Sequence, residues 1–144
     1  MPARRLSKQE FREILIRTRD DLLRHMRKDG FYVWKHGRHV RSHSPITWDI
    51  NAGLCEEFMA TVIRKVAALV RQPGDVRNNY IVAGSAGVRE FDMPDYAHTA
   101  VKFNGRIYDA ECIEGVDDWR KLPLVVNEGR GRPTVGRKCS GAGS

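Results

Sequence analysis

Apolar residues recur at helical spacing near the start of the chain. Between Leu6 and Gly30 they form one stripe, which comprises Phe11, Ile14, Leu15, Thr18, Leu22 and Met26. Ser7 and Glu10 have the spacing of a capping box, and Gly30 is a natural C-terminal stop. The pattern predicts a helix over residues 7–29 that packs one face on a core and exposes a basic face.

A wider apolar face follows in the middle of the chain. It extends from Asn51 or Gly53 to about Val70 and comprises Phe58, Met59, Val62, Ile63, Val66, Leu69 and Val70. A face this wide predicts a central helix that is mostly buried. The preceding stretch, residues 46–50, leads into this helix.

A β-hairpin is the clearest element in the second half of the chain. The dipeptide Asn104-Gly105 separates two β-prone runs, residues 98–103 and 106–111, and Asn-Gly is the strongest short-range hairpin signal. A two-residue loop pairs Phe103 with Arg106, and the register of both strands follows from that pair.

This register brings chemically active side chains together. Side chains alternate between the faces of a sheet, so His98 and Asp109 share a face as diagonal neighbours, with about 7–8 Å between their backbones. Ala100 lies between them and is small enough for the imidazole and the carboxylate to meet. Glu111 falls directly opposite His98, which makes it the alternative carboxylate for the same histidine.

Shorter elements complete an α+β fold, in which two main helices pack on a small antiparallel sheet. The pattern predicts a strand or extended segment at 31–34, a surface loop at 35–43, a strand at 80–83, a helical turn near 117–120 and a last edge strand at 124–126. We expect a single domain over residues 1–128, with a basic N-terminal helix at about 7–29 and a core at about 46–127, followed by a flexible basic tail over residues 129–144.

The composition is that of a soluble globular protein. Hydrophobic residues make up 41% of the chain and charged residues 30%, and no segment is long and apolar enough to cross a bilayer. The first residues lack the apolar stretch of a secretory signal, and the three cysteines show no paired spacing, so we expect a reducing cytoplasm and no disulfide scaffold. Cys112 and Cys139 have no evident partner, and Cys139 is expected to be exposed in the tail.

The net charge of +7 is distributed unevenly. Residues 1–45 carry +7 and residues 128–144 carry +3, whereas residues 46–127 carry −3. A basic first helix and tail around a slightly acidic body keep a protein soluble and can also attract anionic partners. One interpretation is therefore a non-catalytic basic module that binds nucleic acid through residues 4–41 and the tail, or that binds a protein.

Three histidines, His36, His39 and His43, fall close together in the predicted loop. Histidines can hold a metal ion, but this spacing is not a standard one, and Arg38 and Arg41 between them would repel a dication. We therefore expect no metal and no cofactor, and a surface loop that contacts a substrate.

Cys55 is the candidate nucleophile. It lies in the first turn of the predicted central helix, where unpaired backbone N–H groups and the helix dipole favour a thiolate. His98 would favour the thiolate further and act as its general base. Asp109 on the far nitrogen of the imidazole would fix the tautomer and the orientation of the ring.

Further residues are candidates for supporting roles. Trp48, Asp49 and Asn51 lie just upstream of Cys55 and are placed to line its pocket. The Asn51 amide can stabilise an oxyanion together with the helix N–H groups, or it can cap the helix. Glu111 is the alternative orienting carboxylate.

These residues resemble the papain-like group of cysteine enzymes, and within it the transglutaminase-like domains and their small relatives. A Gly-x-Cys that opens a helix matches residues 53–55, and a His–strand–turn–strand–Asp unit matches residues 98–111. The resemblance covers roughly residues 46–115. It implies a papain-like core in which the cysteine, the histidine and the aspartate described above form a catalytic triad.

The resemblance also implies a function. Cys55 would attack an amide carbonyl and form a thioester, in hydrolysis, deamidation or transamidation, with a protein or peptide as substrate. The basic first helix and the His-rich loop would take part in recognition. The chain departs from the family pattern at two places. Many relatives carry an aromatic residue where this chain has Ala100, and here an acidic pair, Glu56-Glu57, follows the cysteine. These departures concern the substrate class more than the triad.

Overall fold

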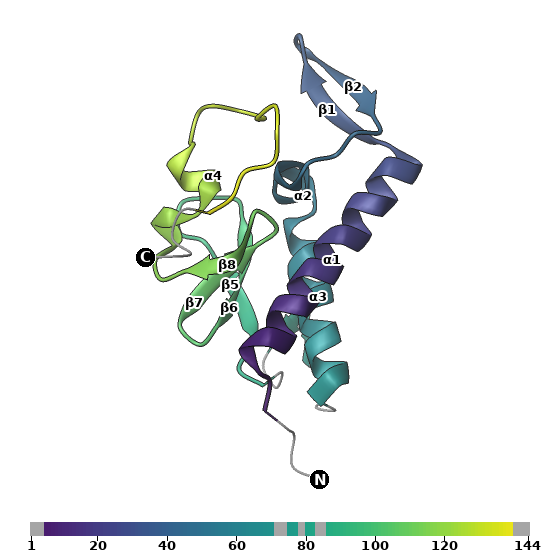
Figure 1. Cartoon of the computed structure of the whole chain (residues 1–144). Helices are drawn as coiled ribbons and strands as arrows, with labels where there is room; N and C mark the ends of the chain where they lie inside the picture. Colours follow the sequence, from purple (N-terminus) through teal and green to yellow (C-terminus); the bar gives the residue numbers. More distant parts are fainter. Residues whose placement is uncertain (1–4, 71–74, 78–79, 83–85, 140–144) are drawn as a thin grey trace.

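The structure, a computed structural model, describes residues 5–70, 75–77, 80–82 and 86–139 and shows an α+β fold (Figure 1). Its helices are α1 (Lys8–Asp29), α2 (Thr47–Gly53), α3 (Cys55–Val70) and α4 (Pro123–Val126), with a 3-10 turn η1 (Trp119–Lys121). Its strands are β1 (Phe31–Lys35), β2 (Arg38–Ser42), β3 (Asp75–Arg77), β4 (Tyr80–Val82), β5 (Arg89–Asp92), β6 (Thr99–Phe103), β7 (Arg106–Asp109) and β8 (Cys112–Val116).

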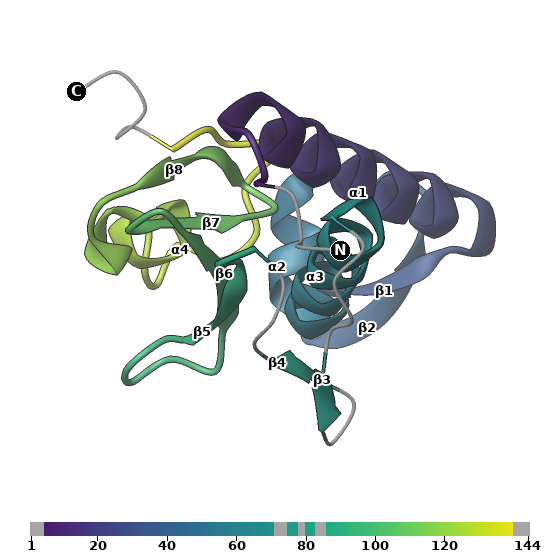
Figure 2. The ribbon, with the colours of Figure 1, turned by 90° about the horizontal axis from the view of Figure 1, so that it is seen from below.

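Two layers hold the main core. The long helices α1 and α3 lie side by side against an antiparallel sheet with the strand order β5-β6-β7-β8 (Figure 2). The core between them includes Phe11, Leu15, Phe58, Met59, Val62, Ile63, Val101, Phe103 and Tyr108. A smaller cluster includes Ala100, Ile107, Cys112, Val116, Leu122 and Cys139, so alternate residues of the sheet face two different apolar clusters.

The first helix forms as predicted. Ser7 Oγ accepts from the backbone N–H of Glu10, and the Glu10 carboxylate accepts from the backbone N–H of Ser7, which completes the capping box. Gly30 ends the helix at φ 80, a conformation that favours glycine. The six residues of the predicted stripe are the buried residues of α1.

The central helix begins later than predicted, because a separate short helix precedes it. The Asp49 carboxylate accepts from the backbone N–H of Ile46 at 2.7 Å at the start of α2. The backbone N–H of Leu54 donates to the oxygen of Ile50 at the end of α2. The backbone oxygen of Leu54 accepts from the N–H of Phe58 in the first turn of α3, which begins at Cys55. The predicted apolar face is buried in α3 except for Leu69, which is 37% exposed.

The hairpin prediction is confirmed in its register. Phe103 pairs with Arg106 and Val101 pairs with Tyr108. The two loop residues have φ values of 52 at Asn104 and 77 at Gly105, as a tight two-residue turn between twisted strands requires. The 3-10 turn η1 overlaps the predicted helical turn at 117–120, and β4 falls in the predicted strand at 80–83, of which residue 83 lies outside the described residues.

Two local predictions are wrong. Residues 35–43 were expected as a surface loop, but β2 pairs with β1 in a second hairpin whose turn, His36-Gly37, also has positive φ values of 52 and 75. Residues 124–126 were expected as an edge strand, but they belong to helix α4. Pro123 at the first helical position starts that helix, because its fixed φ suits a helix and its missing N–H is not needed there.

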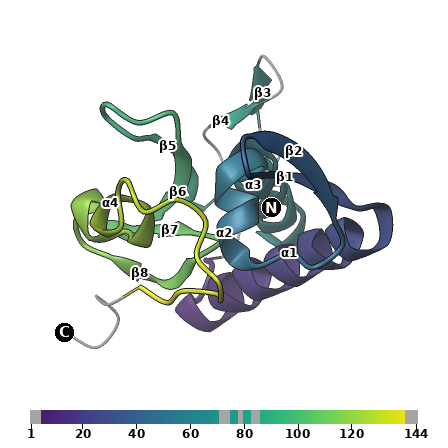
Figure 3. The ribbon, with the colours of Figure 1, turned by 90° about the horizontal axis from the view of Figure 1, so that it is seen from above.

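Residues 129–139, here named the C-terminal segment, pass α2 and then run beside β8 (Figure 3). The segment differs from the flexible tail expected from the sequence, because side chains anchor it to the domain. Arg132 contacts Asp49, and Arg137 contacts Glu111. The remaining tail residues, 140–144, lie outside the described part of the chain.

A disulfide joins the C-terminal segment to the sheet. Cys112 and Cys139 are bonded with 4.9 Å between their Cα atoms, and Cys139 is 8% exposed. The prediction of no disulfide and of an exposed Cys139 is therefore wrong, because spacing along the chain does not reveal which segments the fold brings together. The lack of paired cysteines was one ground for expecting a reducing cytoplasm, and that ground no longer holds. No helix in the described residues is long and apolar enough to cross a membrane.

Candidate functional site

His98 and Asp109 meet at one end of the β6–β7 hairpin. His98 directly precedes β6 and Asp109 ends β7, and Nε2 of His98 lies 3.2 Å from Oδ2 of Asp109. His98 is 5% exposed and Asp109 is 1% exposed, so little water screens the contact. The predicted pairing of the two side chains is present in the structure.

Cys55 lies close to the same imidazole. Its half-buried thiol is near enough to the His98 ring and to the backbone N–H of Thr99 for both to lower its pKa. Because Nε2 of His98 faces Asp109, Nδ1 is the ring atom left for the sulfur. Nδ1 has no hydrogen-bond partner among the described residues, so the thiol lies near the ring without a hydrogen bond to it. Catalytic hydrogen bonds are often long or poorly aligned until substrate binds.

The pKa values of Cys55 and His98 both shift in the direction that favours an ion pair. Burial raises the pKa of the Cys55 thiol, but the contacts with His98 and with the Thr99 N–H outweigh burial and bring this pKa below its usual value. Burial also disfavours a charged His98, but Asp109 and Cys55 outweigh it and raise the pKa of His98 to about 9. The neighbouring charge of Glu56 acts against the Cys55 thiolate. The arrangement favours a thiolate next to an imidazolium.

Glu111 does not hold the imidazole, although the sequence offered it as the alternative orienting carboxylate. Its carboxylate accepts two hydrogen bonds from Arg137, at 2.8 and 3.0 Å, and one from Asn51 at 3.1 Å. Its backbone N–H donates to Oδ1 of Asp109 at 2.9 Å. Asp109 therefore contacts the imidazole, and Glu111 contacts Asp109.

Asn51 lies inside α2, so it is not the N-cap of α3. It is 6% exposed, and its Nδ2 donates to Glu111 across the interface between α2 and the sheet. An amide group has two N–H hydrogens, and the bond to Glu111 uses one of them. The role of Asn51 as a donor to an oxyanion stays a prediction.

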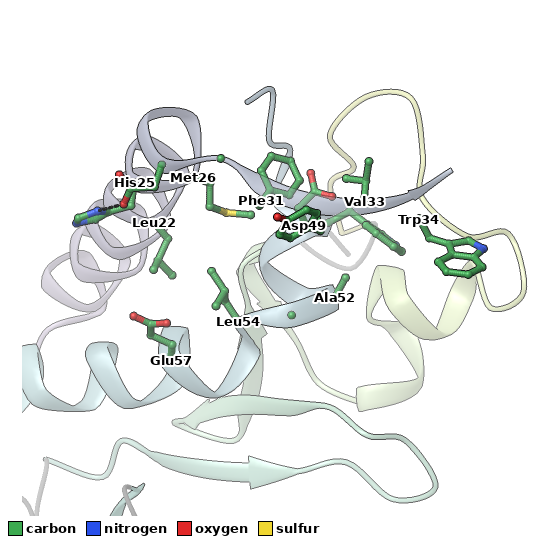
Figure 4. Close-up of a pocket in the computed structure, with 15 residues that line it drawn as sticks. Leu22, His25, Met26, Phe31, Val33, Trp34, Asp49, Ala52, Leu54 and Glu57 are labelled. Atoms are coloured by element: carbon green, nitrogen blue, oxygen red, sulfur yellow. Dashed lines mark ion pairs between the residues drawn. The ribbon is translucent and has the colours of Figure 1, made fainter. Parts of the chain in front are cut away.

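Trp48 lines a cavity of about 620 Å³ where α2 meets the end of α1 and the β1–β2 hairpin (Figure 4). Leu54 and Glu57, which flank Cys55 in the sequence, also line this cavity, whereas Cys55 is not among its lining residues. Cavities of this size accommodate small ligands or side chains. A supporting role for Trp48 at the thiol stays a prediction.

Asp49, also expected near the site, instead links two distant segments of the chain. Its carboxylate accepts from Nε and Nη2 of Arg132, at 2.8 and 3.0 Å, as well as from the N–H of Ile46. Arg132 also donates to the backbone oxygen of Ser44 at 3.2 Å. Asp49 thus connects the start of α2 to the C-terminal segment.

The histidines of the β1–β2 region point to separate partners. The His39 ring contacts the rings of Tyr32 and Trp34, and Nδ1 of His43 lies 2.8 Å from the backbone oxygen of Arg27. Among the described residues no group of three or more histidine, cysteine, aspartate or glutamate side chains is arranged to hold a metal ion.

Arg132, Arg137 and the Cys112–Cys139 disulfide are features of this region that the sequence did not indicate. Both arginines lie in a stretch rich in glycine, arginine and proline, which is typical of a tail. Their partners are 83 and 26 residues away in the chain. Asp49 and Glu111 are buried carboxylates, which require a cation nearby, but their burial is known only from the structure.

The chain matches no protein-family model, no curated protein and no solved structure.

Proposed function

We propose that this protein is a cysteine-dependent enzyme that acts on amide bonds through a thioester intermediate. The observation that carries the proposal is the position of His98, whose ring contacts the Asp109 carboxylate and is close enough to the Cys55 thiol to lower its pKa. A nucleophile, a base and an orienting carboxylate in this order make up the triad of cysteine hydrolases. The proposal includes a papain-like or transglutaminase-like core as the finer description of the fold.

The reaction follows from the ion pair. The Cys55 thiolate attacks the carbonyl carbon of an amide, and the His98 imidazolium gives its proton to the departing nitrogen as the C–N bond breaks. The product is a thioester on Cys55 and a free amine. Neutral His98 then takes a proton from water, whose oxygen attacks the thioester and releases a carboxylic acid, and the thiolate and imidazolium are restored. In a transamidase, a second amine replaces the water.

The developing negative charge on the carbonyl oxygen needs donors. The first N–H groups of α3 have no partners within the helix, and they surround the position of Cys55 at its start. The second Nδ2 hydrogen of Asn51 is the side-chain donor that we propose to join them. Both kinds of donor are fixed before substrate arrives, which is what transition-state stabilisation requires.

We propose a protein or peptide substrate. Cys55 is half-buried, whereas the side chains of His98 and Asp109 are almost fully buried, so the thiol is the member of the triad that a large substrate can reach. The resemblance to papain-like enzymes points to the same substrate class.

The pH dependence of Cys55 alkylation tests the proposal. Because Cys112 and Cys139 are bonded to each other, iodoacetamide reports on Cys55 in the oxidised wild-type protein. We expect wild type to react at a pH well below ~8.5, the pKa of a free thiol. His98→Ala should no longer react at this lower pH, while His25→Ala, a change on the exposed surface of α1, should react like wild type. Equally slow labelling of wild type and His98→Ala at neutral pH would contradict the proposal.

A further inference from the structure

The Asp109 carboxylate is held by a second contact besides that with His98. Oδ2 of Asp109 faces the imidazole, and Oδ1 accepts the backbone N–H of Glu111 at 2.9 Å. The two contacts together fix the rotation of the carboxylate. The position of the Glu111 backbone therefore determines how well Asp109 can orient the histidine.

The Glu111 side chain needs a cation in order to stay where it is. Its carboxylate is completely buried, and a buried charge is stable only when it is paired and hydrogen-bonded. Arg137 supplies a bidentate pair and Asn51 supplies one further bond. Without Arg137, the Glu111 carboxylate would keep, of the hydrogen bonds seen in the described residues, the one from the Asn51 amide.

Arg137 itself is brought to Glu111 by the disulfide. Cys112 is the residue after Glu111, and Cys139 is two residues after Arg137, so the bond joins the two backbones that carry the ion pair. A covalent link of this kind raises the local concentration of the guanidinium at the carboxylate. Away from the disulfide, the Arg132–Asp49 pair also anchors the C-terminal segment, with an Arg132 side chain that is 30% exposed.

We propose that Glu111 and Arg137 are positioning residues for the Cys-His-Asp site and that the Cys112–Cys139 disulfide makes this positioning depend on redox state. The inference rests on the proposed function. Reduction by a dithiol transfers two electrons and two protons to the Cys112–Cys139 bond and leaves the dithiol as a disulfide. Arg137 is then held by non-covalent contacts alone, Glu111 shifts, and Asp109 orients the imidazole less well.

The consequence is a higher pKa of the Cys55 thiol. A less well oriented Asp109 stabilises the imidazolium less, and a weaker imidazolium stabilises the thiolate less. The pH midpoint of Cys55 alkylation therefore reports on the positioning, whereas a loss of structure far from the site would not move it.

The experiment compares the alkylation midpoint in four variants with that of oxidised wild type. Arg137→Ala should raise the midpoint by about one pH unit, and Arg137→Lys should restore part of the shift because it keeps the charge. A variant with both Cys112→Ser and Cys139→Ser should shift the midpoint in the same direction, and Cys55 is its sole thiol. Lys138→Ala, which removes an exposed cation next to Arg137, should leave the midpoint unchanged.

The outcomes separate this inference from the proposed function. If His98→Ala raises the midpoint and Arg137→Ala does not, the positioning role is overturned and the proposed function stands. If His98→Ala leaves the midpoint unchanged, the proposed function fails first. Circular dichroism shows whether each variant folds. If Arg137→Ala does not fold, an unchanged midpoint in both Arg137→Lys and the double serine variant overturns the inference.

Discussion

Nε2 of His98 lies 3.2 Å from Oδ2 of Asp109, although the two residues are 11 positions apart in the chain. The contact assigns the two ring nitrogens to different tasks. In the proposed reaction, Nε2 donates its hydrogen to the carboxylate, and Nδ1 exchanges a proton with the Cys55 sulfur. The proposed chemistry depends on this division, because a ring with the opposite tautomer could not accept the thiol proton.

Replacing Asp109 by asparagine removes the charge that stabilises the imidazolium. We expect Asp109→Asn to lower the pKa of His98 from about 9 toward the ordinary value of about 6.5. A titration of the imidazole signals by NMR measures this directly, and the alkylation midpoint of Cys55 should rise in parallel.

Asp117→Asn is the matched control, since Asp117 is an exposed carboxylate on the same domain whose partner is Lys121. It should leave the His98 titration unchanged. A His98 pKa that stays near 9 in Asp109→Asn would show that another group stabilises the imidazolium and would remove Asp109 from the proposed triad.

The pKa shifts also predict how stability varies with pH. A group whose pKa is raised on folding stabilises the fold fully below its unfolded pKa and loses that contribution as the pH rises through its folded pKa. For His98 the window runs from about 6.5 to about 9. Cys55 acts in the opposite direction, because its pKa is lowered on folding: its contribution is present above the unfolded pKa and is lost as the pH falls through the folded one.

The two contributions are separated by removing the thiol. In a Cys55→Ala background, the free energy of unfolding should fall by on the order of 1–2 kcal/mol between pH 6.5 and pH 9, relative to the variant that also carries His98→Ala. Urea unfolding at a series of pH values provides the measurement. Parallel pH profiles for the two proteins would mean that Asp109 alone does not raise the pKa of His98.

Local rules predicted the part of the site that a turn determines. The Asn104-Gly105 loop admits one register, and the alternation of side chains then puts His98 and Asp109 on one face. The capping box and the apolar stripe predicted α1 for the same reason, because each signal acts within a few residues. The second hairpin was missed because His36 takes the left-handed conformation that asparagine usually supplies.

Contacts between distant segments could not be predicted in this way. The pairs Arg137–Glu111 and Arg132–Asp49 join residues that are 26 and 83 positions apart in the chain. From the sequence alone, both arginines are expected to lie in a solvated tail. The Cys112–Cys139 disulfide also joins segments that are distant in the chain. Nearby in the sequence, the β-branched residues Val125 and Val126 favoured a strand, but the proline before them starts a helix.

Arg132→Ala tests how the C-terminal segment is anchored. Asp49 is 6% exposed, and the change leaves its carboxylate with a backbone N–H and no arginine. An uncompensated buried charge is destabilising, so we expect the free energy of unfolding to fall by about 2 kcal/mol. Urea unfolding with the disulfide intact measures the change.

Arg130→Ala is the control for this prediction, since Arg130 is an exposed arginine two residues earlier in the same segment. Its effect should stay within about 0.5 kcal/mol. Equal stabilities of the two variants would indicate that the Asp49–Arg132 pair contributes nothing beyond a surface ion pair.

Gly115→Ala connects packing to the site. Gly115 has a φ of 78, and a Cβ atom built there would lie 2.5 Å from Cε2 of Tyr108. Tyr108 is 4% exposed, and its ring packs edge-on against Phe11 with 4.8 Å between the centroids, so it has little room to move. We expect the free energy of unfolding to fall by about 3 kcal/mol, from a strained φ and a steric clash together.

Gly105→Ala separates these two causes. Gly105 has nearly the same φ, 77, but no atom lies within 4 Å of the position of its added Cβ, so its substitution should reduce stability by about 1 kcal/mol through backbone strain alone. Because Tyr108 directly precedes Asp109, a displaced Tyr108 should also slow Cys55 alkylation at neutral pH in Gly115→Ala and not in Gly105→Ala. If Gly115→Ala destabilises the protein but leaves Cys55 as reactive as before, the end of β7 tolerates movement, and the orientation of Asp109 must come from Glu111 and His98.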